Sequence, residues 1–238
     1  MYNYEEIRKK RWNNNLRFRK RKWSDEILTE FEDIILSNEI AKYKGRWNEV
    51  FSGEDAIPSA LPLYLEIGTG KGKFISEIAA DNFDKANFVG LEAKAGVLYL
   101  AAKKIMAREL TNVKLLTFDA ENIIDLFAYG EVDRIYINFC DPWPKKRHAK
   151  RRLTYRDFLE KYKIILCFGG EIFFKTDNEE LFEFSLNEVS NFGAQIKNIS
   201  LDLYRNDGQS SYAENVMTEY ETKFNALGQK IYRAEFVL

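Results

Sequence analysis

From Leu63 to the C-terminus, short apolar runs alternate with stretches in which apolar residues recur every three or four positions. The short runs have the length of strands, and the recurring positions are typical of amphipathic helices. The runs predict strands over residues 63–67, 87–92, 113–118, 134–139, 170–175, 197–204 and 230–237. The stretches between them predict helices over residues 73–81, 95–109, 121–128, 154–167 and 179–191. This order predicts an α/β fold, a mostly parallel sheet with helices on both faces.

Local signals support two helix boundaries and predict one more helix. Thr154, followed three residues later by Asp157, can cap the start of a helix, and Gly193 can end the next one. Ser24 and the two acidic residues after it predict the start of a helix over residues 24–40. We expect this helix to pack across the core.

The net charge of -1 conceals an asymmetry along the chain. Residues 1–23 hold nine Lys or Arg against two Glu, a net charge of +7, which leaves -8 for residues 24–238. A basic arm on an acidic domain suggests a polyanionic partner, whereas a solvated tail is the alternative. Trp12, Phe18 and Trp23 lie among the charges and favour an arm that orders on RNA, because bases stack on aromatic faces. The composition, 45% hydrophobic over 238 residues, fits one domain after the arm.

Several classes of protein are disfavoured by the composition. Cys140 and Cys167 lie far apart, without the spacing of a metal site or of a disulfide framework. His148 is the only histidine and lies in a basic run, so we expect neither a zinc ion nor a Ser–His pair. No apolar stretch approaches the roughly 18 residues that span a bilayer, and no apolar signal segment follows the N-terminus. We therefore expect a cytoplasmic protein without a bound metal.

Glycines alternate with other residues directly after the first predicted strand, at Gly68, Gly70 and Gly72. Such glycines permit a tight turn and let a ligand approach the backbone at the electropositive start of the next helix. The dinucleotide fingerprint would have its third glycine where Lys73 stands, and an acidic residue, Glu66, precedes the glycines. These departures favour S-adenosylmethionine over NAD. A plain strand-to-helix turn is the simpler alternative.

Two acidic residues follow at the ends of the next two predicted strands. Glu92 ends strand 87–92, at a distance from Gly68 where an acidic group can accept both ribose hydroxyls. Asp119 follows strand 113–118 and can accept the adenine amino group. Each carboxylate alone is a weak signal, but a glycine turn, an acid and an acid after three successive strands predict a cofactor site.

The strongest motif is the loop Asn138-Phe139-Cys140-Asp141-Pro142-Trp143-Pro144. Two prolines around Trp143 fix a stiff, extended loop that presents the Asp141 carboxylate beside a large aromatic face. Such a loop can hold a nucleobase, and the alternative is a turn in which Trp143 fills the core. Residues 145–152 follow with six Lys or Arg, which would bring RNA phosphates to the carboxylate or simply form solvated surface.

These motifs together resemble the bacterial tRNA (guanine-N7)-methyltransferases of the single-chain TrmB type. The resemblance runs from about Leu16 to the C-terminus, through LEIGTGKG, FVGLEAK, NFCDPWPKKRHAKRRLT, FFKTDNEELFE and MTEYETKFNALGQKIYRAE. It implies the Rossmann-like class I methyltransferase fold, seven strands with an antiparallel last strand. It also implies methyl transfer from S-adenosylmethionine to N7 of guanine 46 in the tRNA variable loop. Cys140 and Ala149 depart from the pattern, where serine and glutamate are more usual, and the first fifteen residues match nothing in it.

The resemblance also implies which residues form the site. Cofactor contacts would come from Glu66, Gly68, Gly70, Gly72, Glu92, Asp119 and Asp141. Substrate contacts would come from Lys145, Asp177, Thr218, Glu219, Tyr220 and Glu221. RNA contacts would come from Arg147, His148, Ala149, Lys150, Arg151 and Arg152.

The chemistry assigns the main role to Asp141. Guanine N7 has an in-plane lone pair and no proton, so attack on the sulfonium methyl requires positioning more than a base. Positive charge moves from sulfur to the base, and a carboxylate between them can orient the guanine and stabilise the cation. The alternatives are methylation of an exocyclic amine, an RNA-binding module without activity, and an NAD-linked oxidoreductase. The sequence leaves open whether the protein is a monomer or a homodimer.

Overall fold

The computed structural model describes residues 30–36, 39, 42–52, 61–205 and 215–238. The chain divides into two compact units, Met1–Glu32 and Asp33–Leu238, and the fold reported below is that of the second unit. The predicted basic arm, residues 1–23, lies outside the described residues. Within the described part of the chain, no helix is long and apolar enough to cross a membrane.

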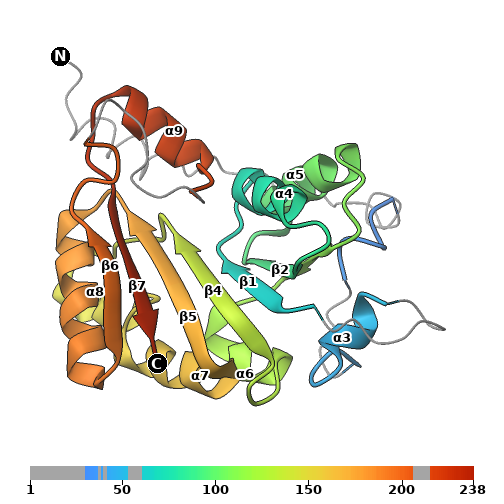
Figure 1. Ribbon diagram of the computed structural model, residues 1–238, viewed down its shortest axis with the longest axis horizontal. Helices are drawn as coiled ribbons and strands as arrows, with labels where there is room; N and C mark the ends of the chain where they lie inside the picture. The colour runs from blue at the N-terminus through green and yellow to red at the C-terminus, as the bar shows by residue number, and fades with distance from the viewer. Residues whose placement is uncertain (1–29, 37–38, 40–41, 53–60, 206–214) are drawn as a thin grey trace. The chain divides into compact units, whose positions relative to one another are not determined.

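Seven strands form one sheet in the order β3-β2-β1-β4-β5-β7-β6 (Figure 1). The strands are β1 Leu63–Ile67, β2 Asn87–Glu92, β3 Val113–Thr117, β4 Val132–Asn138, β5 Leu166–Thr176, β6 Gln195–Ser200 and β7 Tyr232–Val237. Strands β1 to β5 pair in parallel, and β7 runs antiparallel to both β5 and β6. The predicted fold class, a mostly parallel sheet with an antiparallel last strand, is confirmed.

Helices cover the two faces of this sheet in the way that the alternating pattern predicts. The α-helices are α3 Trp47–Val50, α4 Lys73–Asp81, α5 Ala95–Ala107, α6 Ile123–Leu126, α7 Arg156–Ile165, α8 Glu179–Phe192 and α9 Glu219–Ala226. Among the described residues, 3-10 helices include η2 Ala120–Asn122 and η3 Lys146–Arg151. Helices α4 and α5 lie on one face, against β2 and β3, and α6, α7 and α8 lie on the other (Figure 1).

The predicted elements differ from the structure at several places, among them the predicted strand 197–204, which is β6 at Gln195–Ser200, and the predicted cap Thr154, whose hydroxyl bonds to Ser185 instead. Strand β5 begins at Leu166, where the sequence predicts the end of a helix over residues 154–167. Helix α9 was not predicted, because its sequence is mostly polar. In the structure only Glu221 and Phe224 of its residues are buried. The predicted helix 24–40 does not extend over residues 30–36, which form turns and a bridge from Ile35 to β3. Backbone hydrogen bonds to this edge strand replace those of a helix.

The two faces of the sheet differ in chemistry. One face is apolar, and Leu65, Ile135 and Phe174 on it are fully buried against α6, α7 and α8. The other face carries polar and aromatic side chains from the alternate positions, including Glu66 of β1 and Arg134 of β4. Successive side chains of a strand point to opposite faces of the sheet. A strand in which apolar and polar residues alternate therefore gives one apolar face and one polar face. The apolar face supplies most of the core, and the polar face leads to the candidate site.

Gly72 holds α4 close to α5. The residue is the N-cap of α4 with φ +77°, and a Cβ there would lie 2.5 Å from the Cβ of Ala101 in α5. The sequence groups Gly72 with the glycines of a cofactor turn, but in the structure its missing side chain permits helix packing. Gly193 ends α8 with a similar φ of +82°, and no atom lies within 4 Å of its would-be Cβ.

Gly72→Ala should therefore destabilise the fold more than Gly193→Ala. The second variant bears only the strain of a left-handed alanine, about 1 kcal/mol. The first bears the same strain and the clash with Ala101, about 2–4 kcal/mol in total. Urea denaturation of both variants measures the difference, and equal losses of unfolding free energy would show that Gly72 is not a packing residue.

Candidate active site at the carboxyl edge of the sheet

The register of the parallel strands brings five loops to one edge of the sheet. Ile67 at the end of β1 pairs with Leu91 of β2 and with Ile137 of β4. Asn138 at the end of β4 pairs with Lys175 of β5. The loops after these strands therefore start at nearly the same level, and every acidic residue predicted for cofactor binding lies at or next to this edge.

The glycine turn after β1 is held open by its backbone. The amides of Gly68 and Thr69 both donate to the carbonyl of Leu91, at 2.8 and 3.0 Å. Gly68 and Gly70 have φ of +85° and +58°, and the Gly70 amide donates to Oε2 of Glu92 at 3.1 Å. No atom lies within 4 Å of a would-be Cβ on Gly68, so the turn faces open space. This geometry lets a ligand approach the backbone.

Glu66 is a buried acid behind this turn. Its side chain lies on the polar face of β1 and is 3% exposed. Burial raises the pKa of Glu66 to about 8, against the opposing effect of a hydrogen bond from Asn138 and of the Lys175 charge. The Asn138 amide nitrogen donates to Oε1 of Glu66 at 3.4 Å. A neutral carboxyl group at this place is ready to lose its proton when a cation binds beside it.

Three buried oxygen atoms beside the turn lack hydrogen-bond partners among the described residues: Glu66 Oε2, Thr69 Oγ1 and Asn138 Oδ1. Unpaired buried acceptors are costly, and each requires a ligand, an ion or water to satisfy it. S-adenosylmethionine presents an ammonium group, an amine and hydroxyls, all of them donors. The donor-rich cofactor therefore fits the acceptors that the chain leaves unpaired. Thr69 and Asn138 were not among the predicted cofactor residues, although both belong to the quoted motifs.

The other two predicted cofactor acids lie at the ends of β2 and β3. Glu92 accepts hydrogen bonds from the amides of Gly70 and Lys94, at 3.1 and 3.0 Å, and so stiffens both turns. Asp119 is exposed and caps η2 by accepting from the Glu121 amide at 3.0 Å. Both carboxylates keep lone pairs that a ligand in the open turn can use.

The loop after β4 has an unusual backbone. Phe139 and Trp143, on either side of Asp141, have φ of +52° and +41°, in the left-handed region that non-glycine residues seldom adopt. Asp141 itself is exposed, and no described residue forms a hydrogen bond or ion pair with its carboxylate. Strained backbone of this kind persists where the surrounding structure fixes it, and it concentrates at functional sites.

The basic run after the loop forms the 3-10 helix η3. Lys146, Arg147, Lys150 and Arg151 are exposed, as is Lys145 before them. His148 lies edge-on to the Trp143 ring, with centroids 5.7 Å apart, and the Arg151 guanidinium lies 4.9 Å from the same ring. Desolvation and the charges of Arg151 and Arg147 lower the pKa of His148. Ala149 has no polar side-chain atom, so only its backbone can contact RNA.

Arg152 differs from the other cations of the run. It is 9% exposed and donates from Nε to the Pro142 carbonyl and from Nη2 to the Trp143 carbonyl, each at 3.1 Å. RNA contact was expected there from charge alone. In the structure the guanidinium faces the loop, which makes Arg152 the least accessible charged side chain of the run.

The predicted substrate residues before β7 form a fixed helix start. Thr218 and Glu221 make a capping box at the start of α9, with reciprocal hydrogen bonds of 2.9 and 3.1 Å. Glu221 is fully buried and pairs with Lys175 of β5 at 2.7 Å, and its other oxygen accepts from the Tyr204 hydroxyl. Burial lowers the pKa of Lys175, and the Glu221 carboxylate opposes this effect. Asp177, half-buried, follows two residues later in the chain.

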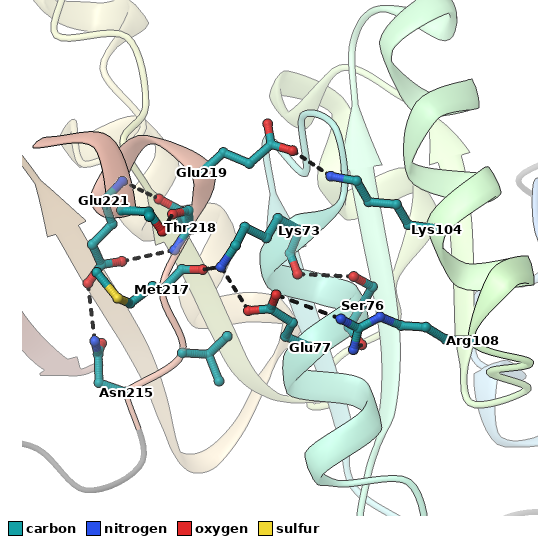
Figure 2. Close-up of polar contacts among 12 residues, drawn as sticks. Lys73, Ser76, Glu77, Lys104, Arg108, Asn215, Met217, Thr218, Glu219 and Glu221 are labelled. Carbon is teal, nitrogen blue, oxygen red and sulfur yellow. Dashed lines mark hydrogen bonds and ion pairs between the residues drawn. The ribbon is translucent and has the colours of Figure 1, made fainter. Parts of the chain in front are cut away.

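Helices α4 and α5 tie this helix start to the cofactor turn, as Figure 2 shows. Lys73, the first residue of α4, donates to the Met217 carbonyl at 2.7 Å and pairs with Glu77 at 2.9 Å. Lys104 of α5 pairs with Glu219 at 2.5 Å. These bonds join the predicted substrate segment to α5 and to the first residue of α4, directly after the glycine turn. Lys73 carried no functional signal in the sequence beyond its departure from a glycine pattern.

Tyr220 connects the same segment to the loop after β4. Its ring is 49% exposed and lies in a stacked arrangement with Phe139, the centroids 6.5 Å apart. The structure therefore brings together the glycine turn, Glu66, Glu92, the Asp141 loop and the start of α9. These features define the class of S-adenosylmethionine-dependent methyltransferases.

Comparison with known proteins gives the family. Residues 60–234 match the family described as "Putative methyltransferase". A tRNA (guanine-N(7)-)-methyltransferase of Bacillus subtilis (strain 168) is 50% identical over 220 residues, which cover 92% of this chain and 98% of the relative. That of Clostridioides difficile (strain 630) is 48% identical with the same coverage of both chains. The chain belongs to the bacterial tRNA (guanine-N(7)-)-methyltransferase family.

Solved structures support the fold independently of these relatives. The crystal structure of a SAM dependent methyltransferase from Aquifex aeolicus matches with a TM-score of 0.51 at 13% identity, covering 74% of this chain and 82% of that chain. The structure of an antibiotic related methyltransferase matches with a TM-score of 0.52 at 19% identity, covering 74% and 86%. At this identity the similarity shows the fold alone.

Glu66→Gln should remove part of the pH dependence of stability. The folded state raises the pKa of Glu66 from 4.5 to about 8, so its contribution to stability is complete below pH 4.5 and is lost as the pH rises towards 8. The unfolding free energy of the variant, relative to that of the wild type, should therefore rise by about 1 kcal/mol for each pH unit in this window. Denaturation of the ligand-free proteins across the window measures this gain. Glu183→Gln, an exposed acid on α8, is the charge-matched control, and parallel curves for wild type and Glu66→Gln would contradict the assignment.

Proposed function

We propose that the protein transfers the methyl group of S-adenosylmethionine to N7 of guanine 46 in the variable loop of tRNA. The observation that carries this proposal is Asp141, exposed between two left-handed aromatic residues at the edge where the open glycine turn lies. The reaction of relatives about half identical to this chain supports it. Position 46 rests on the family resemblance.

The chain offers a place for the cofactor at the glycine turn. When bound, S-adenosylmethionine supplies an electrophilic methyl group on a sulfonium. Glu66, Thr69 and Asn138 would accept hydrogen bonds through the oxygen atoms that now lack partners. Glu92 and Asp119 would accept from the ribose hydroxyls and the adenine amine, and Gly68 and Gly70 leave room for the ligand against the backbone. Gly72 would contribute through the packing of α4 rather than through contact.

Asp141 would act on the charge that develops during transfer. N7 attacks through a lone pair without losing a proton, so the site needs orientation and electrostatic stabilisation rather than a general base. A carboxylate beside the base stabilises the cationic imidazole ring of the product. Because no described residue pairs with the Asp141 carboxylate, its charge remains available to the substrate.

The substrate segment would orient the guanine, and the basic run would bind the backbone of the RNA. Exposed cations in η3 and at Lys145 suit phosphate contacts. His148 and Arg151 contact the Trp143 ring and so keep it beside these cations. Asp177 and residues 218–221 border the same edge, with Tyr220 offering an exposed ring for stacking. Their roles in binding follow from the resemblance.

The remaining expectations concern the whole protein. Because tRNA is the proposed substrate, we place the enzyme in the cytoplasm, and we propose that the basic residues 1–23 add phosphate contacts. Both a monomer and a homodimer agree with this function, since every proposed contact comes from one chain.

Incubation with methyl-labelled cofactor and unmodified tRNA transcripts tests the proposed reaction. Digestion of the RNA should yield the label in 7-methylguanosine, and a transcript with adenine in place of guanine 46 should remain unlabelled. Label in a different nucleoside would reject the assignment to N7. Tight tRNA binding without any transfer would favour an RNA-binding module.

Asp141→Ala and Glu92→Ala should separate chemistry from cofactor binding. Loss of the Asp141 charge should lower kcat by about 100-fold or more while the cofactor Kd changes little. Loss of Glu92 should weaken the cofactor by about tenfold, because its carboxylate holds the turn and faces the ribose. Calorimetry and single-turnover kinetics measure the two effects, and equal losses of cofactor affinity would reject this division of roles.

A further inference from the structure

One arginine of the basic run faces inward. The guanidinium of Arg152 lies 4.2 Å from the ring of Phe184 in α8, and two of its nitrogen atoms donate to the carbonyls of Pro142 and Trp143. Desolvation lowers the pKa of Arg152. Among the described residues it forms no salt bridge, so its directed contacts are with the loop and with one aromatic face.

The loop needs such support because its own backbone has few N–H groups that could donate hydrogen bonds. Pro142 and Pro144 have no N–H, and Trp143 between them adopts φ +41°. The Asp141 loop continues beyond the end of β4, and the Phe139 amide at its start donates to the Lys175 carbonyl of β5 at 2.9 Å. The two carbonyls that Arg152 holds belong to the two residues that directly follow Asp141, so the guanidinium fixes the direction in which the chain leaves this residue.

We propose that Arg152 is a positioning residue for methyl transfer, one that holds the Asp141 loop in its strained form and does not contact RNA. This inference rests on the proposed function. Its neighbour Arg151 is the contrast, because it is exposed, lies 4.9 Å from the centroid of the Trp143 ring, and is suited to a phosphate contact. The two adjacent arginines thus have different roles, because Arg152 holds the loop and Arg151 faces the substrate.

The two assignments predict different kinetic effects. Displacement of a reacting group by about 1 Å can cost on the order of 100-fold in rate without loss of binding. Arg152→Ala should therefore lower kcat by about 100-fold while KM for tRNA and the salt dependence of tRNA binding stay near the wild-type values. Arg151→Ala should weaken tRNA binding and reduce the slope of log K against log salt by about 1.

The experiment compares Arg152→Ala, Arg152→Lys and Arg151→Ala in the full-length protein. Methylguanidinium at millimolar concentration should restore a measurable part of kcat to Arg152→Ala and none to Arg151→Ala, with sodium chloride as the ionic-strength control. Arg152→Lys keeps the charge and one donor nitrogen, and it should retain more activity than Arg152→Ala. A smaller salt slope with unchanged kcat in the Arg152 variants would overturn the proposal and make Arg152 an RNA contact.

Hydrogen exchange separates this proposal from the function on which it rests. Peptides that contain residues 139–145 should exchange faster in Arg152→Ala than in the wild type or Arg151→Ala, whether or not the protein methylates tRNA. If the wild type gives no 7-methylguanosine, the proposed reaction fails while the exchange result still decides the role of Arg152. Unchanged exchange and unchanged kcat in Arg152→Ala and Arg152→Lys would contradict the positioning role.

Discussion

The site depends on one constraint, the register of the parallel strands. Because Ile67, Leu91 and Ile137 lie side by side, the loops after β1, β2 and β4 leave the sheet at one edge. Side chains separated by more than seventy residues in sequence, such as Glu66 and Asn138, come within hydrogen-bond distance there. Each loop then needs only a short motif directly after its strand. The sheet places the start of each loop, and side-chain contacts such as those of Arg152 with the Asp141 loop then fix its course.

The division of the sheet into an apolar and a polar face determines where stability and function lie. Burial against α6, α7 and α8 supplies the hydrophobic stabilisation that the fold requires. The other face carries buried polar groups, among them the unpaired oxygen of Glu66 and the ion pair of Lys175 with Glu221. Such groups add little net stability and are costly when one partner is lost. The ion pair of Lys175 with Glu221 holds the start of α9, and the unpaired oxygen of Glu66 agrees with the proposed cofactor site.

The sequence predicted what depends on local signals and failed where burial decides. Short apolar runs predicted the strands, and the glycine turn and its acids were predicted from their positions at the strand ends. Arg152 looked like any cation in a basic run, because a sequence does not reveal which of several like charges turns inward. Gly72 looked like part of a ligand turn, because its contact with Ala101 joins two helices 29 positions apart. Helix α9 was not predicted, although Thr218 and Glu221 have the spacing of a capping box, since its exposed residues give little periodicity.

A crystal structure of the protein with S-adenosylhomocysteine tests the central claim most directly, because the claim concerns where the cofactor lies. We predict the ligand at the turn of Gly68 and Gly70, with Glu66 and Glu92 in contact and its sulfur towards the Asp141 loop. A competing space is a cavity of about 490 Å³ on the polar face of the sheet, which borders the site at Asn138 and extends to Arg134 and Tyr136. A ligand bound in that cavity, away from the glycine turn, would contradict the assignment of the site.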